Sequence, residues 1–331
     1  MLTNSNAMQG FSRIMALLAL AVSTAANAQA ETPLRWKFKE NDNLNYVLSR
    51  NVEGKLDLTG SEILFKMGMD FDVTWKVKSV AADGAAQVDL IVDRMQINMS
   101  SPLGGDLVYD SQNPAQMAGP VWAQMSPMVE GMVGQTFPVN ISPLGKVSDI
   151  KMPDKLAEVF RKQAQNPNRQ AGFGIGGGFS ERQIKELIEK SVLPLPEVAP
   201  GKGVTWKQHF ENPLPRMGSQ MTDTTFSFAG PEKLDGKPLE KISAVTEMTF
   251  EAADNAMADV EITAQEGSAT FYFDPQAGHM VQAKATQTFV MEITGAREIT
   301  QDMKESMTMR LGTSPAAKPQ EGASKTGKTN S

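Results

Sequence analysis

Few residues of this 331-residue chain are arranged in a way that could support catalysis. Cysteine is absent, which excludes thiol catalysis, disulfide bonds and cysteine-ligated metal sites. The two histidines, His209 and His279, lie far apart in the sequence, so they do not form a pair with metal-ligand spacing. Because no Gly-x-Ser-x-Gly motif accompanies them, we expect both histidines to be surface residues and not catalytic bases.

Acidic residues occur in two close pairs, which could act as acid and base or bind Ca²⁺. Asp70 and Asp72 share one face of a predicted strand, and Asp89 and Asp93 are spaced for the same arrangement. Lysines alternate with the first pair, and such a mixture is typical of the solvated face of a sheet. The chain also lacks an Asp-x-Asp-x-Asp-Gly calcium loop. We therefore expect no metal site and no other cofactor.

A glycine-rich run over residues 172–178 is the nearest feature to a phosphate-binding loop. It precedes Ser180-Glu181-Arg182-Gln183, a capping-box pattern that opens a helix and could present backbone amides to an anion. Neither Gly-Lys-Ser nor Gly-Lys-Thr follows the run, and the preceding residues do not predict the strand that nucleotide fingerprints require. A flexible connection between two elements is therefore the preferred interpretation.

Charge and the N-terminal segment indicate where the protein acts. A net charge of −6 and a pI near 5.2 give no electrostatic reason to bind nucleic acid. Arg13 precedes an apolar run, Ile14 to Val22, and then small residues, which is the order of a secretory signal peptide. The run is shorter than the roughly 20 residues that span a bilayer. We predict a signal peptide over residues 1–28, with cleavage after Ala28 or Ala30, and a periplasmic or extracellular chain without a transmembrane segment.

The first part of the mature chain alternates apolar and polar residues with the period of a β-strand. The pattern predicts one strand over residues 44–58, interrupted at Arg50 and Gly54, and an uninterrupted strand over residues 63–77. A third strand follows, in which the apolar phase shifts at Asp93-Arg94. Such a shift predicts a β-bulge, and bulges bend sheets.

The remaining chain separates into a helical part, a second strand-rich part and a tail. Short helical segments broken at Pro120 and Pro127 are predicted, and further helices begin near Pro153 and after Ser180. The predicted strands of the second part cover residues 204–211, 221–228, 241–252, 258–273, 279–293 and 298–311.

These elements predict an α+β fold that is rich in β-structure. We expect a long, curved antiparallel sheet or incomplete barrel, with a helical insertion between two strand-rich segments. The expected domain covers residues 29–311, with strands over 34–110, the helical insertion and linker over 111–200, and strands over 203–311. Residues 312–331 are polar and predict a disordered tail.

The 21 methionines are the most informative residues for function, and they fit two interpretations. Methionine could simply replace leucine in an ordinary core. Alternatively, it could line a soft, adaptable apolar cavity, because its flexible side chain repacks around varied apolar partners. The candidate lining residues of such a cavity are Phe65, Met67, Met69, Phe71, Trp75, Trp122 and Met125.

Three motifs carry a resemblance to a known group of proteins. They are Leu34-Arg35-Trp36-Lys37-Phe38-Lys39 with Leu44-Asn45-Tyr46, Val73-Thr74-Trp75-Lys76-Val77, and Tyr272-Phe273-Asp274-Pro275 through Gly278. The chain resembles a family of uncharacterised exported proteins of planctomycete-type bacteria, which implies no activity, ligand or site residues. In architecture alone it is similar to the incomplete barrels of periplasmic lipoprotein carriers, whose helices plug an apolar concavity. This similarity of shape implies an apolar ligand.

Three functions from different classes follow from these observations. The favoured hypothesis is an exported, non-enzymatic protein that binds an apolar or lipid-like ligand in a concavity of the sheet. The alternative is a structural or protein-interaction module of the cell envelope that takes no small-molecule ligand. An enzyme is the least favoured, because no nucleophile or base is recognisable.

Overall fold

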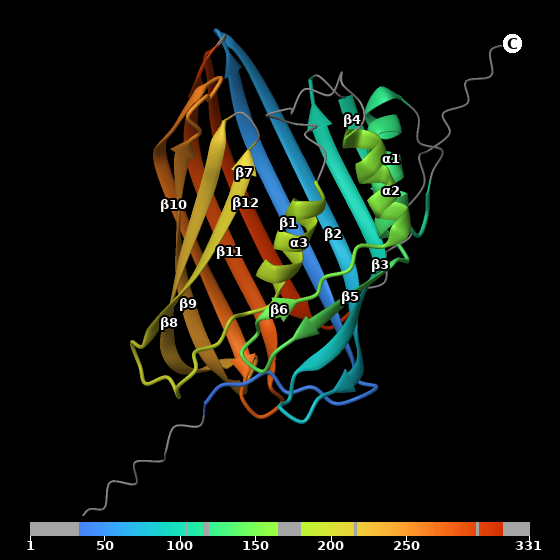
Figure 1. The fold of residues 1–331 in the computed structure, drawn as a ribbon, viewed down its shortest axis with the longest axis vertical. Coiled ribbons are helices and arrows are strands. Elements are labelled where there is room, and N and C mark those ends of the chain that lie inside the picture. The colour runs from blue at the N-terminus through green and yellow to red at the C-terminus, as the bar shows by residue number, and fades with distance from the viewer. Residues whose placement is uncertain are drawn as a thin grey trace, which may run out of the picture. The chain divides into compact units, whose positions relative to one another are not determined.

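The computed structural model shows, in the residues that it describes, one antiparallel sheet with three helices in the middle of the sequence (Figure 1). It describes residues 33–102, 105–114, 119–164, 180–214, 217–295 and 298–313. The expected signal peptide over residues 1–28, the glycine run over 172–178 and the tail beyond residue 313 lie outside the described residues.

Twelve strands of the described chain form the sheet. They are β1 (Asn43–Leu58), β2 (Ser61–Val80), β3 (Ala86–Ser101), β4 (Gly105–Asp110), β5 (Thr136–Ile141), β6 (Val147–Ser148), β7 (Thr205–Leu214), β8 (Gly218–Leu234), β9 (Lys237–Ala252), β10 (Asp259–Asp274), β11 (His279–Thr294) and β12 (Glu298–Leu311). Their order is β6-β5-β3-β2-β1-β12-β11-β10-β9-β8-β7, and β4 pairs with β3. β1 and β12 are thus neighbours, and their pairing joins the two strand-rich segments into one sheet. The predicted fold class is confirmed.

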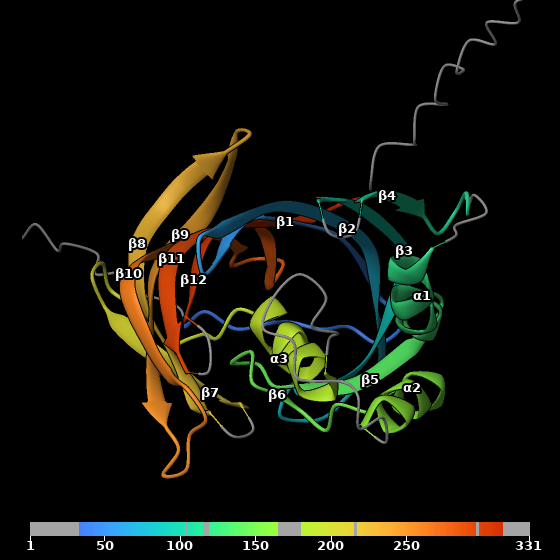
Figure 2. The ribbon, with the colours of Figure 1, turned by 90° about the horizontal axis from the view of Figure 1, so that it is seen from above.

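The sheet is curved, and its concave face carries the apolar positions predicted for β1 and β2. Seen from above in Figure 2, the strands curl around helix α3 (Glu181–Ser191). The predicted bulge in β3 is confirmed, because the pairing passes from Asp72 opposite Arg94 directly to Val73 opposite Val92 and leaves Asp93 unmatched. This extra residue accounts for the phase shift in the sequence and adds local bending.

Helix α1 (Pro120–Met132) corrects one prediction. The sequence predicted segments broken at Pro127, whereas the helix continues through this residue. A proline inside a helix costs about 3 kcal/mol. Here the exposed Pro127 is followed by Met128, Val129 and Met132, whose burial in the core stabilises the helix. Helix α2 (Asp154–Ala164) begins directly after Pro153, as predicted.

Helix α1 completes the wall of the sheet at an interrupted edge. β5 pairs with β3 from Ala86 to Ile91, and β4 pairs with it from Gln96 to Ser101, so the middle of this β3 edge has no strand neighbour. There Val133, at the end of α1, forms a bridge to Val92. The helix therefore covers the gap between β4 and β5 along β3 (Figure 1).

An aromatic cluster fills the concave face at one end of the sheet. The ring of Trp36 lies 5.8 Å from that of Trp75 and 5.6 Å from that of Phe273, and Tyr46 lies 4.9 Å from Trp75. Two polar atoms in the cluster have backbone partners: Trp36 Nε1 donates to the carbonyl of Leu193 at 2.9 Å, and Tyr46 Oη donates to that of Met280 at 2.9 Å. This end is a filled core.

The segment after α3 crosses the same end of the concavity. The sequence predicted a plain linker here, but Val192, Leu193 and Leu195 are buried. The amide of Leu195 donates to the carbonyl of Leu144 at 2.8 Å, which fixes the segment to the turn between β5 and β6. The linker is therefore part of the core.

We expect Trp36→Ala to destabilise the protein by about 3–5 kcal/mol, because it leaves a large cavity in a filled core. Urea unfolding followed by far-ultraviolet circular dichroism measures the change. Trp206→Ala is the control, because Trp206 is only half-buried where it stacks on Phe226 at the edge of the sheet. Equal losses for the two variants would contradict the assigned role of Trp36.

An ion pair holds β4 to β3. Arg94 is almost fully buried, and its Nε donates to Oδ1 of Asp110 at 2.9 Å while its Nη2 bonds to Oδ2. The hydrogen bond from Arg94 is the main cause that lowers the pKa of Asp110 below its usual range. The pair therefore stabilises the folded state above the ordinary aspartate pKa of about 4, and this contribution is lost as the pH falls through the lowered value.

We expect Asp110→Asn to cost about 3–5 kcal/mol at neutral pH, because it leaves the buried Arg94 without its counter-charge. The difference from the unmodified protein should begin to shrink as the pH falls below about 4, where Asp110 of the unfolded chain takes up a proton, and should vanish once the pH is below the lowered pKa of the folded protein. Denaturant unfolding over a pH series measures both effects. Asp106→Asn on the same strand, at an exposed position, should show neither.

Candidate functional site

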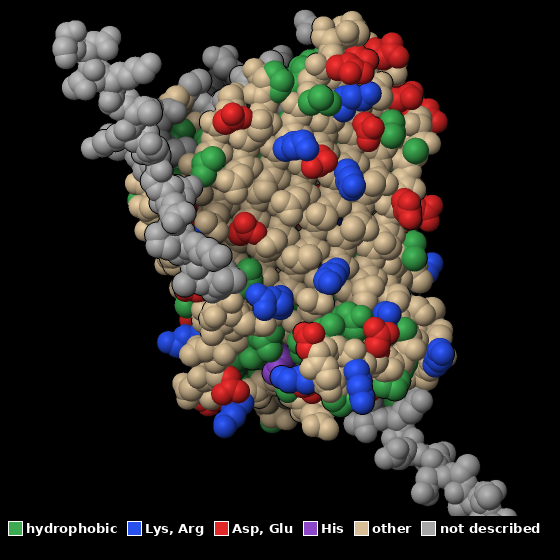
Figure 3. All heavy atoms as spheres, turned by 180° about the vertical axis from the view of Figure 1, so that it is seen from behind, with side chains coloured by type: hydrophobic (Ala, Val, Ile, Leu, Met, Phe, Trp, Pro, Cys, Tyr) green, Lys and Arg blue, Asp and Glu red, His purple; other side chains and the backbone are tan. Residues whose placement is uncertain are grey.

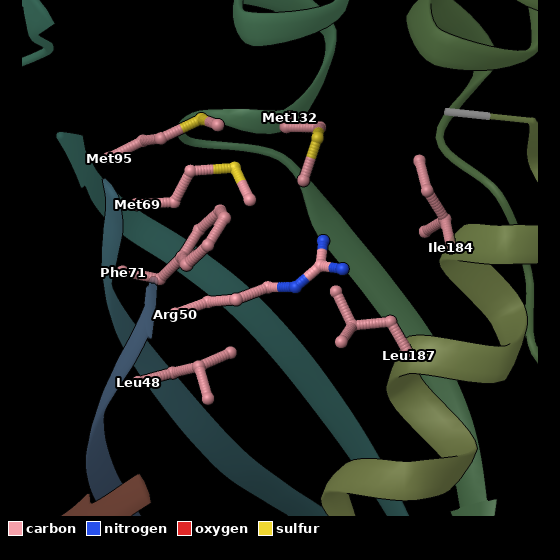
Figure 4. Close-up of a pocket in the computed structure, with 8 residues that line it drawn as sticks. All are labelled: Leu48, Arg50, Met69, Phe71, Met95, Met132, Ile184 and Leu187. Atoms are coloured by element: carbon pink, nitrogen blue, oxygen red, sulfur yellow. The ribbon is translucent and has the colours of Figure 1, made fainter. Parts of the chain in front are cut away.

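A small cavity lies on the concave face, between the sheet and helix α3 (Figure 4). Its floor comes from β1, β2 and β3, and its other side from α1 and α3. The lining residues are Leu48, Arg50, Met69, Phe71, Met95, Met132, Ile184 and Leu187. Seven are apolar and three of these are methionines, so the cavity is apolar except for one guanidinium group. Its volume of about 10 Å³ is enough for one water-sized molecule.

Helix α3 lies over the concave face, and its sequence is amphipathic and begins with an N-terminal capping box. Ser180 accepts a hydrogen bond from the amide of Gln183, whose side chain bonds back to the amide of Ser180, which confirms the predicted capping box. Ile184 is buried, and Leu187 reaches the cavity from the next turn. The outer face is charged and carries ion pairs between residues four apart. The helix thus lies over the concavity and contacts it through only a small number of its apolar side chains.

A polar strip interrupts the apolar concave face. Arg50 of β1 forms a two-point ion pair with Glu305 of β12, with Nε to Oε1 at 2.6 Å and Nη2 to Oε2 at 3.1 Å. Both side chains are about one quarter exposed, at 27% and 28%. Gln287 of β11 lies directly opposite Glu305, and its Nε2 is buried with no acceptor among the described residues. A buried donor without a partner lowers the stability of the folded state, so the strip contains one unsatisfied hydrogen-bond donor.

A second apolar cluster lies beyond the strip, toward the hairpins that join β1 to β2 and β11 to β12. Its buried members are Val52, Leu56 and Phe65, and Met67 and Met303 pack against them. Gly54 makes room for this packing, since an added Cβ would lie 2.3 Å from the Phe65 ring and 2.7 Å from the sulfur of Met303. The interruption that the sequence showed at Gly54 thus has a packing cause.

The structure distributes the predicted lining residues of the sheet over three places. Met69 and Phe71 line the cavity under α3. Phe65 and Met67 belong to the second apolar cluster. Trp75 packs in the filled aromatic end, against Trp36 and Tyr46. Only the first pair therefore lies beside the cavity.

The two predicted residues of the helical insertion lie on α1. Trp122 and Met125 are half-buried and pack against the core, and the Trp122 ring lies 4.7 Å from that of Tyr109 on β4. They support the wall at the edge of β3. The α1 residue that reaches the cavity is Met132.

Sequence reasoning missed the polar strip, although the sequence carried a signal for it. Arg50, Glu305 and Gln287 each occupy an apolar-phase position of their strand. Each interruption by itself resembles ordinary variation in a strand. Only the pairing of β1 with β12, and of β12 with β11, brings the three side chains together on one face.

The other candidate residues are not assembled into a catalytic centre. Nδ1 of His209 lies 2.9 Å from Oδ1 of Asp223, but both side chains are more than half exposed. His279 is half-buried, in contrast to the predicted surface position, and this burial lowers its pKa below the usual value. Among the described residues, no three histidine or acidic side chains are grouped for metal binding.

The outer face of the sheet differs from the concave face. Figure 3 shows it as a surface with scattered charged side chains and little apolar side-chain area. Thr286, Ser306 and Asn51 lie side by side there on β11, β12 and β1. Asp70 and Asp72 also lie on this face, and the negative charges of both help to raise the pKa of Arg94. The acidic pair therefore belongs to the solvated side of the sheet, as predicted.

We expect Gly54→Ala to destabilise the protein by about 1–3 kcal/mol, because the added methyl group must displace the ring of Phe65. Gly68→Ala on the neighbouring strand is the matched control, since its Cβ would lie no closer than 3.2 Å to another atom, Oδ1 of Asn51. Urea unfolding of both variants measures the difference. The packing assigned to Phe65 is wrong if the two substitutions have the same effect.

Comparison with known sequences gives one family match. Residues 83–230 match a family of unknown function, DUF6263. The match spans β3 to most of β8, including the three helices, and so contains Met95, Met132, Ile184 and Leu187 of the cavity. No curated protein matches the sequence. None of the helices in the described residues is long and apolar enough to cross a membrane.

Three solved structures show distant likenesses to the chain. A lipovitellin structure concerned with lipid–protein interactions has a TM-score of 0.38 and 12% identity, over 85% of this chain and 26% of that chain. An outer membrane channel from Pseudomonas putida F1 has a TM-score of 0.23 and 8% identity, over 84% and 97% of the two chains. A DUF1329 family protein from Desulfovibrio piger has a TM-score of 0.16 and 9% identity, over 80% and 85%. The chain spans about a quarter of the lipovitellin chain. The chain is therefore similar in sequence, over residues 83–230, to a family of unknown function.

Proposed function

We propose that the protein is an exported, non-enzymatic protein that binds an apolar or lipid-like ligand in the concavity between the sheet and helix α3. The observation that carries this proposal is the apolar cavity under α3, with Met69 and Met95 in its floor and Met132 at its side. Methionine side chains fill irregular space and repack at low cost, so such a lining adapts to a flexible chain.

Ligand entry requires helix α3 to move away from the sheet. The cavity has room for a water-sized molecule, which is far less than the volume of a lipid chain. Only one residue of α3, Ile184, is fully buried, and Leu187 and Ile188 are half-buried. An element held by so little buried apolar area separates from the rest of a protein more easily than a central strand does. The helix is therefore the movable cover in this proposal.

Export is the second part of the proposal. The N-terminal segment has the order of a signal peptide, with the basic Arg13, an apolar run and small residues before Ala28. The absence of cysteine fits a fold held by the hydrogen bonds of a long sheet and by a buried core. The resemblance to exported proteins of planctomycete-type bacteria supports the same location, periplasmic or extracellular.

A structural or protein-interaction role in the cell envelope is the second candidate. It is favoured by the aromatic end of the concavity, where Trp36, Tyr46 and Trp75 leave no space for a ligand. If the whole concave face behaved in this way, the sheet would enclose an ordinary core, and α3 would be a fixed part of it. Ligand binding decides between the two candidates.

We expect the protein to bind a fluorescent long-chain fatty acid, and Leu187→Glu to weaken this binding by about tenfold or more, because it places a charge in the apolar cavity. Titration with the fluorescent probe measures affinity, and native mass spectrometry of protein purified without detergent measures stoichiometry. Val245→Glu is the matched control, since Val245 is exposed on the outer face.

The control variant should bind as the unmodified protein does. Circular dichroism of both variants confirms that they fold. If the protein carries no lipid and binds no probe, the ligand-binding proposal fails and the structural role takes its place. Equal binding by both variants would place the ligand outside the cavity under α3.

A further inference from the structure

We propose that the ligand is a single-chain amphiphile with a carboxylate head, and that the guanidinium of Arg50 receives this head. The inference rests on the proposed function and names its ligand class. It assigns the apolar chain to the space under α3, and the head to the polar strip formed by Arg50, Glu305 and Gln287.

The ion pair with Glu305 holds Arg50 in place and leaves part of it free. A guanidinium group has five N–H donors, and Glu305 engages one on Nε and one on Nη2. Nη1 has no acceptor among the described residues. Figure 4 shows the guanidinium of Arg50 extending from β1 toward Met132 and Leu187, into the apolar cavity. The end of the group formed by Nη1 and Nη2 can therefore bind a planar carboxylate through two parallel hydrogen bonds.

Gln287 is a second, independent indication of a polar ligand atom. It lies opposite Glu305 on the concave face, and its buried Nε2 has no acceptor in the described part of the chain. Gln287 does not line the cavity itself, but most buried donors in folded proteins have a partner, so an orphan donor in the polar strip indicates that a bound molecule supplies one. A carboxylate at the strip offers oxygen acceptors to Gln287 as well as to Arg50.

The surroundings favour one small anionic head on one apolar chain. Apolar side chains flank the strip on both sides, with Met69 and Met307 on one side and Val52 and Met303 on the other. These surroundings match an amphiphile whose only polar part is its head. Glu305 already balances the single charge of Arg50, which favours a monoanionic carboxylate over a larger, more highly charged phosphate head.

The test compares three ligands with the same chain and different heads: palmitate, hexadecanol and hexadecyl phosphate. Each competes with the fluorescent fatty acid at a concentration below its micelle threshold, at a pH where palmitate is ionised. We expect palmitate to bind at least about tenfold more tightly than hexadecanol, which is the scale of one charge-assisted hydrogen bond. It should also bind more tightly than hexadecyl phosphate.

Two variants test the residues assigned to the head, and a third is their control. Arg50→Met combined with Glu305→Met should remove the preference for palmitate over hexadecanol without leaving an unpaired charge on the concave face. Glu305→Gln alone should increase the preference, since the charge of Arg50 is no longer balanced. Arg310→Met is the matched control, because Arg310 is an exposed cation of β12 on the opposite face, and it should leave the preference unchanged. Circular dichroism and thermal unfolding show whether each variant folds.

The outcomes separate this inference from the function on which it rests. Equal binding of palmitate and hexadecanol, or a preference that survives the double substitution, overturns the role of Arg50 and leaves apolar binding intact. Tighter binding of hexadecyl phosphate overturns the carboxylate assignment. Failure of all three ligands to bind overturns the proposed function together with the inference.

Discussion

The aromatic contact between Trp36, Trp75 and Phe273 is the constraint on which the concavity depends. The sheet is open in the described chain, because its edge strands β6 and β7 do not pair, so hydrogen bonding within the sheet does not fix its curvature. Trp36 precedes β1, yet it packs on Phe273 of β10 and donates to the carbonyl of Leu193. Trp36 therefore contacts both strand-rich segments and the linker at one end of the sheet. These contacts hold the segments together in a chain that has no cysteine for disulfide bonds.

The concave face is packed differently at its two ends. Near Trp36 the space is filled, while farther along the strands the cover is reduced to helix α3, and five of the seven apolar side chains that line the cavity there are methionines and leucines. The same face carries the pair of Arg50 and Glu305, whose charges are stabilised by each other. The end near Trp36 is thus densely packed. The region under α3 contains flexible methionine side chains and one cation, Arg50, whose position is fixed by Glu305.

Much of the sheet could be predicted from the sequence, because side chains on a strand alternate between two faces and the apolar residues reveal which face is buried. The bulge at Asp93 and the capping box at Ser180 were predicted for the same reason, since each depends on neighbouring residues. The continuity of α1 through Pro127 was not, because it depends on the burial of Met128 and Val129 against distant strands. The separation of Trp75 from the cavity depends in the same way on Trp36.

The sequence by itself determined the strands, the helical insertion, the lack of disulfide bonds and the apolar character of the concave face, because these follow from composition and local periodicity. Only the tertiary structure decided which apolar residues fill space and which border a cavity. It also brought Arg50, Glu305 and Gln287 together from distant parts of the chain. The physical reason is strand pairing: the register between β1, β12 and β11 sets which side chains become neighbours, and that register depends on the whole sheet.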